Sequence, residues 1–223
     1  MKILNLSLMA FWVLLFNSNS NSQNIVKEND ENYNRITFSY SLDSFSSKYT
    51  PWNQLNLEYE KRFSAFSIIP RINYSNRFDI SDWMMEFDSY IFFSKNTYSY
   101  LNAGISDNKI FPHYRFGIEP YQNLPEAFEI SIGFRYLSFS NTDIGIYTGS
   151  IGKYVSDYWI SFRPFIVPES DNLKVTYNLI TRKYFADKFN YLSLKLGWGK
   201  FPNQELTVSE INLISSKSVG IAY

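Results

Sequence analysis

The sequence predicts an all-β protein: an antiparallel transmembrane β-barrel of about twelve strands, preceded by an N-terminal signal peptide. Two features of the whole chain support this prediction. Apolar and polar residues alternate along most of the 223 residues, which is the period of a strand with one apolar and one polar face. Aromatic residues are abundant, with 20 Phe, 18 Tyr and 5 Trp. A membrane barrel uses such residues on its lipid face and at both membrane interfaces.

The N-terminus has the three parts of a secretory signal. Met1-Lys2 is followed by an apolar run over residues 3–16 and by small polar residues over 17–23. Because Ser20 and Ser22 meet the small-residue requirement of a cleavage site, we expect a signal peptide over residues 1–22. The apolar run is shorter than the roughly 20 residues of a transmembrane helix, and no later segment approaches one. A role in the membrane must therefore come from strands.

Residues 23–34 form a short polar segment, and residues 35–223 are predicted to form the barrel domain. Its most regular part is a hairpin with a turn at Asn123-Leu124-Pro125. On the second strand of this hairpin, one parity is apolar: Phe128, Ile130, Ile132, Phe134 and Tyr136. Similar alternation recurs along the chain at 36–42, 55–60, 66–75, 83–91, 100–105, 144–149, 158–163, 173–182, 192–198 and 219–223.

The connections between these segments also favour a membrane barrel. Short breaks near 63–64, 95–96, 123–125, 155–156 and 186–188 alternate with longer ones at 43–51, 106–112 and 200–209. Outer-membrane barrels have short periplasmic turns and longer outer loops. The link near Ser140-Asn141 departs from this pattern, because it is short but falls at the outer end.

A soluble sandwich or lipocalin shows the same alternation with its apolar face inward. Strands of about ten residues, long enough to cross a bilayer at a tilt, favour the membrane instead. So does a polar face rich in Gly, Ser, Asn, Arg and Glu rather than in Lys. Four tryptophans are expected at the membrane interfaces: Trp52, Trp83, Trp159 and Trp198.

The chemical inventory indicates that the protein is not an enzyme and has no cofactor. Lys plus Arg and Asp plus Glu are both 21, so nothing points to nucleic acid, and there is no cysteine. His113 is the only histidine, which excludes a histidine cluster for a transition metal. A serine hydrolase acting on lipid would need His113 beside a serine on the outer barrel surface. Residues 148–152 contain two glycines but do not precede a helix, so they are weak evidence for a nucleotide site.

The polar parity carries a set of charges that is expected to face the lumen. The predicted network consists of Glu58, Arg71, Glu86, Asp88, Arg115, Glu119, Glu129, Arg135, Arg163 and Arg182, with Glu60, Arg77 and Lys195 on the same face. A short link at 79–81 sets Arg71 near Glu86 or Asp88.

In the hairpin, a symmetric turn at Leu124 places Glu119 opposite Glu129, which is unfavourable unless an arginine compensates. The compensating arginine would be Arg115, Arg135 or one on a strand further round. A shifted register with Gly117 opposite Glu129 would relieve the repulsion instead.

Three functions are compatible with this network. The first is structural, with arginines and carboxylates packing the lumen and cross-linking the wall. The second is a narrow pore or a binding pocket for a small anionic or sugar-like solute. A wide porin is disfavoured by bulky residues expected inside: Tyr90, Tyr100, Tyr121 and Tyr147. The third, an enzyme, has the weakest basis, because neighbouring arginines would keep Glu119 and Glu129 ionised and leave no general acid.

A series of short motifs, in a consistent order over residues 34–202, resembles the YaiO-type outer-membrane β-barrel family. The motifs include Pro51-Trp52, Leu57-Glu58-Tyr59, Arg71-Ile72-Asn73-Tyr74, Tyr98-Ser99-Tyr100-Leu101-Asn102, Phe111-Pro112, Arg115-Phe116-Gly117-Ile118-Glu119, Gly133-Phe134-Arg135-Tyr136-Leu137, Tyr147-Thr148-Gly149-Ser150, Arg163-Pro164 and Arg182-Lys183-Tyr184-Phe185.

The resemblance implies the outer membrane of a Gram-negative bacterium and no established activity. It implies outer-membrane lipids and, during insertion, the barrel-assembly machinery as partners. Relatives often continue past the end of this sequence. Tyr223 is therefore either the terminal aromatic that the machinery reads or the end of an incomplete barrel.

Overall fold

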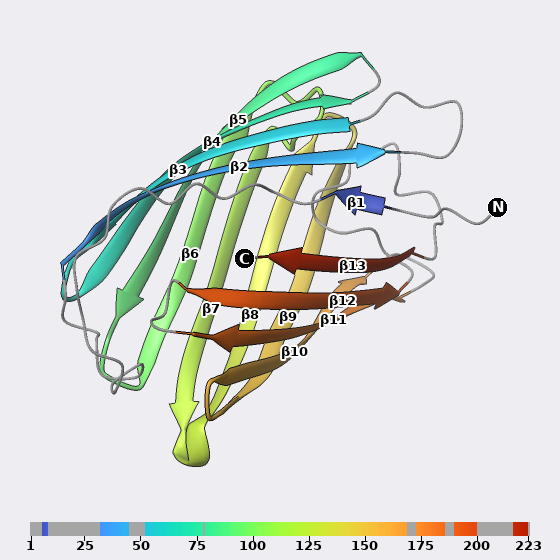
Figure 1. The fold of residues 1–223 in the computed structure, drawn as a ribbon. Coiled ribbons are helices and arrows are strands. Elements are labelled where there is room, and N and C mark those ends of the chain that lie inside the picture. Colours follow the sequence, from blue (N-terminus) through green and yellow to red (C-terminus); the bar gives the residue numbers. More distant parts are fainter. Residues whose placement is uncertain are drawn as a thin grey trace.

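The computed structural model describes residues 6–8, 32–44, 52–77, 79–168, 173–185, 190–199 and 216–222. These residues form one sheet of thirteen antiparallel strands, in which each strand pairs with the next along the chain (Figure 1). The strands are β1 (Leu6–Leu8), β2 (Asn34–Ser44), β3 (Trp52–Arg62), β4 (Phe66–Arg77), β5 (Ile80–Phe92), β6 (Thr97–Ser106), β7 (Tyr114–Leu124), β8 (Phe128–Phe139), β9 (Thr142–Val155), β10 (Tyr158–Pro168), β11 (Leu173–Tyr184), β12 (Tyr191–Gly199) and β13 (Ser216–Ala222). The all-β class and the antiparallel order are confirmed.

Helix is almost absent from the described residues. A single 3-10 turn, η1 (Pro125–Ala127), joins β7 to β8. In the part of the chain that the structure describes, no helix has the length and apolar character needed to cross a membrane.

The sheet curls around an interior but is not closed. In Figure 1, β2 to β5 lie above and β11 to β13 below, with the strands between them completing the curve. Side chains from β3 and from β12, nine strands apart in the order of the sheet, line one cavity. Among the described residues, no pairing joins the edge strands β1 and β13. The structure is therefore a strongly curved sheet, whereas the sequence predicted a closed barrel.

Among the connections from β2 to β13, the longest gather at one end of the sheet, as the sequence predicted. At the first end the strands are joined by residues 63–65, 93–96, 125–127, 156–157 and 185–190. At the second end they are joined by residues 45–51, 78–79, 107–113, 140–141, 169–172 and 200–215. We call these the short-turn end and the long-loop end. The tight links at 78–79 and 140–141 lie at the long-loop end, so the alternation of lengths is incomplete.

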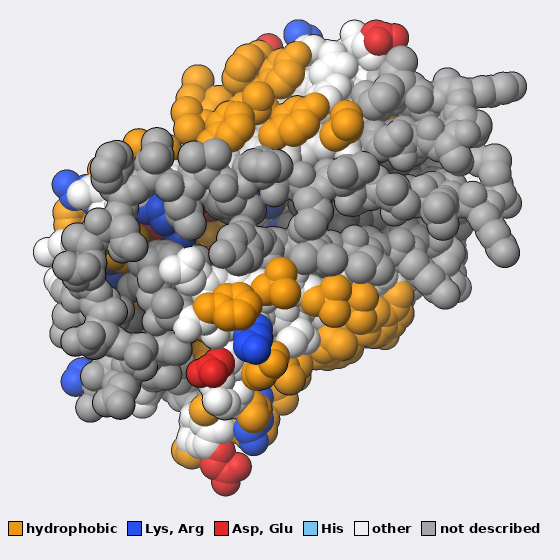
Figure 2. All heavy atoms as spheres, viewed as in Figure 1, with side chains coloured by type: hydrophobic (Ala, Val, Ile, Leu, Met, Phe, Trp, Pro, Cys, Tyr) orange, Lys and Arg blue, Asp and Glu red, His pale blue; other side chains and the backbone are white. Residues whose placement is uncertain are grey.

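Apolar side chains lie on the outside of this sheet and charged ones on the inside. Ile132 and Met85 are 71% and 65% exposed, whereas Glu119 and Asp88 are 2% and 1% exposed. Figure 2 shows hydrophobic side chains in broad patches on the described surface. A water-soluble protein has the opposite distribution, because burying charge and exposing apolar surface are both unfavourable in water. The outward apolar face therefore argues against the soluble sandwich or lipocalin.

The interior also contains an apolar cluster, two members of which, Ile144 and Ile146, the alternation placed outside. Leu137, Ile144, Ile146 and Val167 pack together near the long-loop end, with Phe139 and Phe165 against them. The turn at 140–141 pairs Arg135 with Ile146, so the even residues of β9 share the inner face with the odd residues of β8. By the same register Tyr147 points outward, against Phe134, and the prediction of an inward Tyr147 was wrong.

The four tryptophans divide between the two faces. Trp83 and Trp198 are exposed on the outer face, where interfacial aromatics were expected. Trp52 is buried beneath Arg77, and Trp159 lies beneath Arg182, with 5.0 Å between each guanidinium carbon and ring centroid. The prediction was wrong for these two, because their parity along β3 and β10 places them on the inner face.

The predictions for the two termini lie mostly outside the described residues. Of the predicted signal peptide, only Leu6–Leu8 is described, as β1 paired with the end of β2. The cleavage site before Gln23 and the terminal Tyr223 lie outside the described residues.

Candidate functional site

Eight charged side chains cross the interior between the two ends of the sheet, and we call them the charged belt. Its members are Glu58, Arg71, Glu86, Asp88, Arg115, Glu119, Arg135 and Arg163. All eight belong to the network that the sequence predicted. The remaining two, Glu129 and Arg182, lie elsewhere on the inner face.

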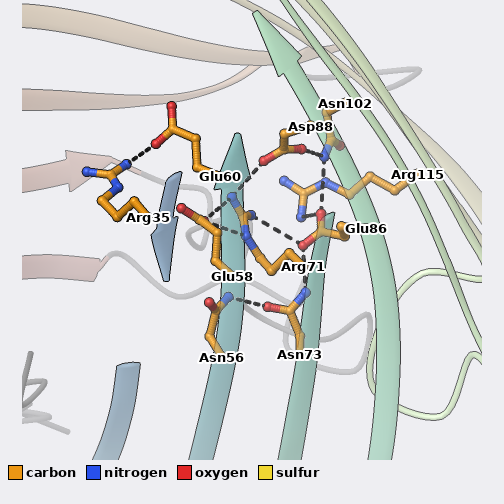
Figure 3. A network of polar contacts seen from close by, with 10 residues as sticks. All are labelled: Arg35, Asn56, Glu58, Glu60, Arg71, Asn73, Glu86, Asp88, Asn102 and Arg115. Atoms are coloured by element: carbon orange, nitrogen blue, oxygen red, sulfur yellow. Dashed lines mark hydrogen bonds and ion pairs between the residues drawn. The ribbon is translucent and has the colours of Figure 1, made fainter. Parts of the chain in front are cut away.

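Arg71 is the centre of the first half of the belt (Figure 3). The register places it opposite Glu58 on β3 and Glu86 on β5. Its Nη2 lies 2.9 Å from Glu58 Oε2 and 2.6 Å from Asp88 Oδ2, and its Nη1 lies 3.5 Å from Glu86 Oε2. The turn at 78–79 sets this register, and the predicted proximity of Arg71 to Glu86 and Asp88 is present. One guanidinium therefore faces three carboxylates, in charge-assisted contacts that are shorter and stronger than neutral ones.

Glu86 connects Arg71 to the next strands. Arg115 Nη1 lies 2.9 Å from its Oε1. The amide of Asn73 donates to Glu86 Oε2 at 2.7 Å, and the amide of Asn102 donates to Glu86 Oε1 at 3.2 Å. Asn102 also donates to Asp88. These neutral donors matter because Glu86 and Asp88 are buried, and a buried carboxylate is costly unless its oxygens are bonded.

Glu119 is the centre of the second half. Arg163 Nη1 lies 2.6 Å from Glu119 Oε1 and 2.8 Å from Oε2, and Arg135 Nη2 lies 3.7 Å from Oε2. The Ser131 hydroxyl donates to Oε1 at 2.6 Å. Arg163 comes from β10 and reaches over β9 and β8 to a residue of β7. The principal partner of Glu119 is thus on a strand further round, one of the alternatives that the sequence left open.

The two registers considered for the hairpin were both wrong. The structure pairs Asn123 with Glu129 and Gly117 with Arg135, so Glu119 does not face Glu129. The reason is the position of the turn: Glu126 and Ala127 adopt positive φ of 59° each after Pro125, which moves its centre beyond Leu124.

Gly133 lies against Glu119 instead of another carboxylate. A Cβ at Gly133 would stand 2.9 Å from Glu119 Cγ, so the absence of a side chain there makes room for the buried glutamate. Glu129 accepts a hydrogen bond from the Tyr98 hydroxyl at 2.9 Å. The two glutamates therefore have separate partners and separate surroundings.

The other predicted charges of the inner face lie apart from the belt. The Arg182 guanidinium carbon is 5.0 Å from the ring centroid of Trp159 and 4.9 Å from that of Tyr191. Glu60 accepts from Arg35 at 2.5 Å and from the Tyr33 hydroxyl at 2.8 Å. Burial and the Glu60 carboxylate raise the pKa of Tyr33, which precedes β2, above its ordinary value.

Arg77 and Lys195 occupy two further positions on the inner face. Arg77 Nε donates to the Ser75 hydroxyl at 3.1 Å, and its guanidinium covers Trp52. Lys195 lies on the wall of the interior cavity.

Four tyrosines form a layer on the short-turn side of the belt, and we call them the tyrosine layer: Tyr90, Tyr98, Tyr100 and Tyr121. Tyr98 and Tyr121 stack with 4.6 Å between ring centroids, and Tyr90 and Tyr100 are 5.2 Å apart. The Tyr121 hydroxyl accepts a hydrogen bond from Arg163 at 3.0 Å, which joins this layer to the belt. The sequence anticipated three of these tyrosines inside and missed Tyr98, although its parity matches that of Tyr100.

At the long-loop end, residues 107–113 fold inward and are held by Asp82. Asp82 Oδ2 accepts hydrogen bonds from the backbone N–H groups of Lys109, Ile110 and Phe111 at 3.0, 2.8 and 3.0 Å. Ile110 and Phe111 are buried. Asp82 was not among the residues predicted from the sequence, although two adjacent apolar residues in an outer loop, Ile110 and Phe111, indicated that the loop turns inward.

His113 helps to close the same loop. Its Nδ1 lies 2.9 Å from the backbone carbonyl oxygen of Ser106, and the Ser106 hydroxyl donates to the carbonyl of Pro112 at 2.8 Å. Both groups are thus engaged with backbone carbonyls. Among the described residues, no cluster of three or more histidine, aspartate or glutamate side chains is placed to hold a metal ion.

Between the belt and the long-loop end lies a cavity of about 360 Å³. Its basic wall residues are Arg71, Arg115, Arg135, Arg163 and Lys195, and its acidic one is Glu86. Its apolar wall includes Met84, Phe111, Leu137, Ile146 and Phe165. Phe111 and Pro112 bring the inward loop to the wall, so the loop held by Asp82 also shapes the cavity.

Comparison with known protein families explains why the outer face of this sheet is apolar and its inner face charged. The model of the YaiO membrane beta barrel domain matches residues 33–204, which include β2 to β12. The chain belongs to the YaiO membrane β-barrel family. Neither the curated proteins nor the solved structures yielded a match.

Membership of the YaiO family gives the exposed apolar face a physical meaning. The strands β2 to β12 contain 9 to 14 residues, and a tilted strand of about 9–11 residues crosses a bilayer. Outward residues such as Ile132 and Met85 are then in contact with hydrocarbon, where their exposure is not a cost. The interior is the only region left for the charged side chains, and there they pair with one another.

Proposed function

We propose that this protein is an integral β-barrel of the outer membrane of a Gram-negative bacterium, without enzymatic activity, whose interior is cross-linked by the charged belt. Its role is then in the envelope, either structural or in the handling of surface polysaccharide. The observation that carries the proposal is the inverted distribution of side chains, with an apolar exterior and a buried charged interior. Family membership supports the membrane location.

The belt supports a structural role because its bonds join strands that are not neighbours. Arg163 ties β10 to β7, and Tyr98 ties β6 to β8 through Glu129. Such contacts across the interior hold the curvature of the sheet, which the ladders between adjacent strands do not determine alone. The tyrosine layer takes up space in the interior towards the short-turn end, which argues against a wide aqueous channel.

We test the membrane location by introducing an arginine on the outer face at two positions that differ in their expected depth in the bilayer. Ile132 lies in the middle of β8, and Val155 is the last residue of β9. We expect Ile132→Arg to reduce the amount of folded barrel in the outer-membrane fraction, because arginine at the bilayer midplane costs about 2–4 kcal/mol. Val155→Arg is the matched control, with a cost of about 0–1 kcal/mol near the interface.

The readouts are membrane fractionation and the heat-dependent gel mobility that folded barrels show. The unaltered protein should be in the outer membrane and should migrate differently before and after boiling. Recovery of the protein as a soluble periplasmic species, or equal tolerance of arginine at both positions, would refute the membrane barrel.

A second candidate function is a binding pocket for a small anionic or sugar-like solute. The cavity of about 360 Å³ favours it, because its wall carries five basic residues and one acidic residue. The tyrosine layer favours a pocket over a through-pore. The lipid hydrolase has less support, since His113 is bonded to a backbone carbonyl. Envelope-lipid hydrolysis that disappears in His113→Ala would restore it.

A further inference from the structure

The charge on the cavity wall is unbalanced although the belt as a whole is not. The belt contains four basic and four acidic side chains. Glu58, Asp88 and Glu119 are not on the cavity wall, whereas the four arginines are, together with Lys195. These three carboxylates therefore hold the arginines from outside the cavity. We expect a positive potential in the cavity, because the basic groups on its wall are nearer to it than these carboxylates and a nearer charge contributes more.

The cavity also has an apolar side. Met84, Phe111 and Leu137 line it together with Ile146 and Phe165, near the long-loop end. Arg135 lies 5.5 Å from the ring centroid of Phe165, so the basic and the apolar parts of the wall meet at this pair. A ligand with one charged group and one apolar portion could contact both parts. A sugar, which is polar all round, would leave the apolar wall without a complementary surface.

The size of the cavity limits the ligand. A volume of about 360 Å³ is near the lower end of ligand pockets, and it holds about twelve water molecules at roughly 30 Å³ each. The ligand therefore has a similar number of non-hydrogen atoms. The tyrosine layer lies in the interior on the short-turn side, so we expect the ligand to enter from the long-loop end, beside the loop held by Asp82.

We infer that this cavity binds a small organic anion, in which a carboxylate or phosphate head contacts Arg135 and Lys195 and an apolar tail packs against Phe165, Ile146 and Phe111. Arginine suits such a head, because its fork of N–H donors matches two oxygens of a carboxylate or phosphate. Arg71, Arg115 and Arg163 have a different part, since their short contacts with belt carboxylates fix them in place. The inference rests on the second candidate function above and names its ligand class.

The test measures ligand binding to the full protein in nanodiscs of uncharged lipid by isothermal titration calorimetry. It compares three probe ligands of similar size. The probes are 3-phenylpropionate, phenyl phosphate and the neutral 3-phenyl-1-propanol. We expect at least one anion to bind about tenfold or more tightly than the alcohol, as a charge-assisted contact implies. The better of the two anions identifies the head group. Acetate and inorganic phosphate, which lack the apolar tail, should bind more weakly than their aromatic counterparts.

Two variants and a control locate the site. Arg135→Gln and Lys195→Gln should each weaken binding of the preferred anion by about tenfold. Arg182→Gln removes an equal charge from the inner face but not from the cavity wall, and should change the affinity less than about twofold. If a wall variant fails to fold, Phe165→Ala tests the apolar contact, with an expected loss of about tenfold for the aromatic anions and little change for acetate.

The outcomes distinguish failure of the anion site from failure of the membrane barrel. A protein that fractionates with the membrane and shifts on heating, but binds no anion better than the alcohol, would overturn the anion site and leave the barrel intact. An equal loss in Arg182→Gln would also overturn the site, because it would show general attraction by the interior. A protein that fails fractionation would refute the barrel itself.

Discussion

Arg71 lies among three carboxylates, and its removal would leave charges inside the sheet without their partner. Its Nη2 is 2.6 Å from Asp88 and 2.9 Å from Glu58, and the side chains of Asp88 and Glu86 are each only 2% exposed. A buried ion pair contributes little net stability when intact, but breaking one side of it is costly. The same reasoning applies to Glu119 and Arg163 in the other half of the belt.

We therefore predict that Arg71→Met destabilises the folded protein by about 3–5 kcal/mol, because it leaves buried carboxylates uncompensated. The measurement is urea unfolding in detergent, followed by tryptophan fluorescence and by gel mobility. Arg182→Met is the control, since Arg182 is stacked on Trp159 and Tyr191 rather than paired with the belt. Equal losses for the two substitutions would contradict this view of the belt.

Gly133 allows a second prediction at the scale of one residue. A Cβ at this position would lie 2.9 Å from Glu119 Cγ and 3.1 Å from the carbonyl oxygen of Ile118. Gly133→Ala should cost about 1–3 kcal/mol, because the buried glutamate must shift away from Arg163. Gly117→Ala is the matched control on the neighbouring strand, where the closest atom would be at 3.5 Å. An unfolding midpoint unchanged by Gly133→Ala would contradict the close fit.

At the scale of elements, the loop 107–113 depends on one carboxylate. Asp82 binds three consecutive backbone N–H groups, at Lys109, Ile110 and Phe111. No strand ladder holds this segment, so its inward position relies on these bonds, on those between Ser106 and residues 112–113, and on burial of its apolar residues. The β7–β8 register likewise depends on local geometry, namely that of the turn at η1.

We predict that Asp82→Ala releases the loop without unfolding the sheet. Amide exchange at residues 109–111 should become faster by about tenfold or more, because their N–H groups lose a charge-assisted acceptor. Hydrogen exchange with mass spectrometry would measure this, and the amides of β7 should change little. Asp143→Ala serves as the control, because Asp143 is exposed beside the turn at 140–141 at the same end of the sheet. Unchanged exchange in Asp82→Ala would show that the loop does not depend on Asp82.

At the scale of the whole molecule, different groups of side chains occupy the interior at successive positions along the strands. The tyrosine layer lies at the short-turn end, the charged belt follows, and the cavity and apolar cluster lie towards the long-loop end. We expect a molecule built in this way to present a pocket rather than a passage.

The corresponding prediction concerns ion flow. The unaltered protein in planar bilayers should show no stepwise conductance, because the stacked pair Tyr98–Tyr121 and the charged belt take up space in the interior. The double substitution Tyr98→Ala and Tyr121→Ala should produce small openings, since it removes two aromatic side chains from the interior. Stepwise current through the unaltered protein would contradict the pocket and favour a pore.

Much of the architecture could be predicted because it is a local property of the chain. Period-two alternation determines which side chains share a face, and it correctly grouped the eight residues of the belt. The same rule failed on β9, where Ile144 and Ile146 were assigned to the outside. Parity within a strand says which residues lie together, but not which of the two groups faces inward when both contain apolar residues.

What the tertiary structure decided is how residues from different strands meet. A shift of the turn centre to Glu126 and Ala127 separated Glu119 from Glu129, and no pattern in the strands themselves encodes that shift. The contact of Arg163 with Glu119 spans three strands, so it depends on the curvature of the sheet rather than on neighbours in sequence. The sequence alone thus determined the strands, the faces of most of them and the membrane barrel family. The turns decided the register, the curvature decided the partners across the interior, and these long-range contacts created the cavity.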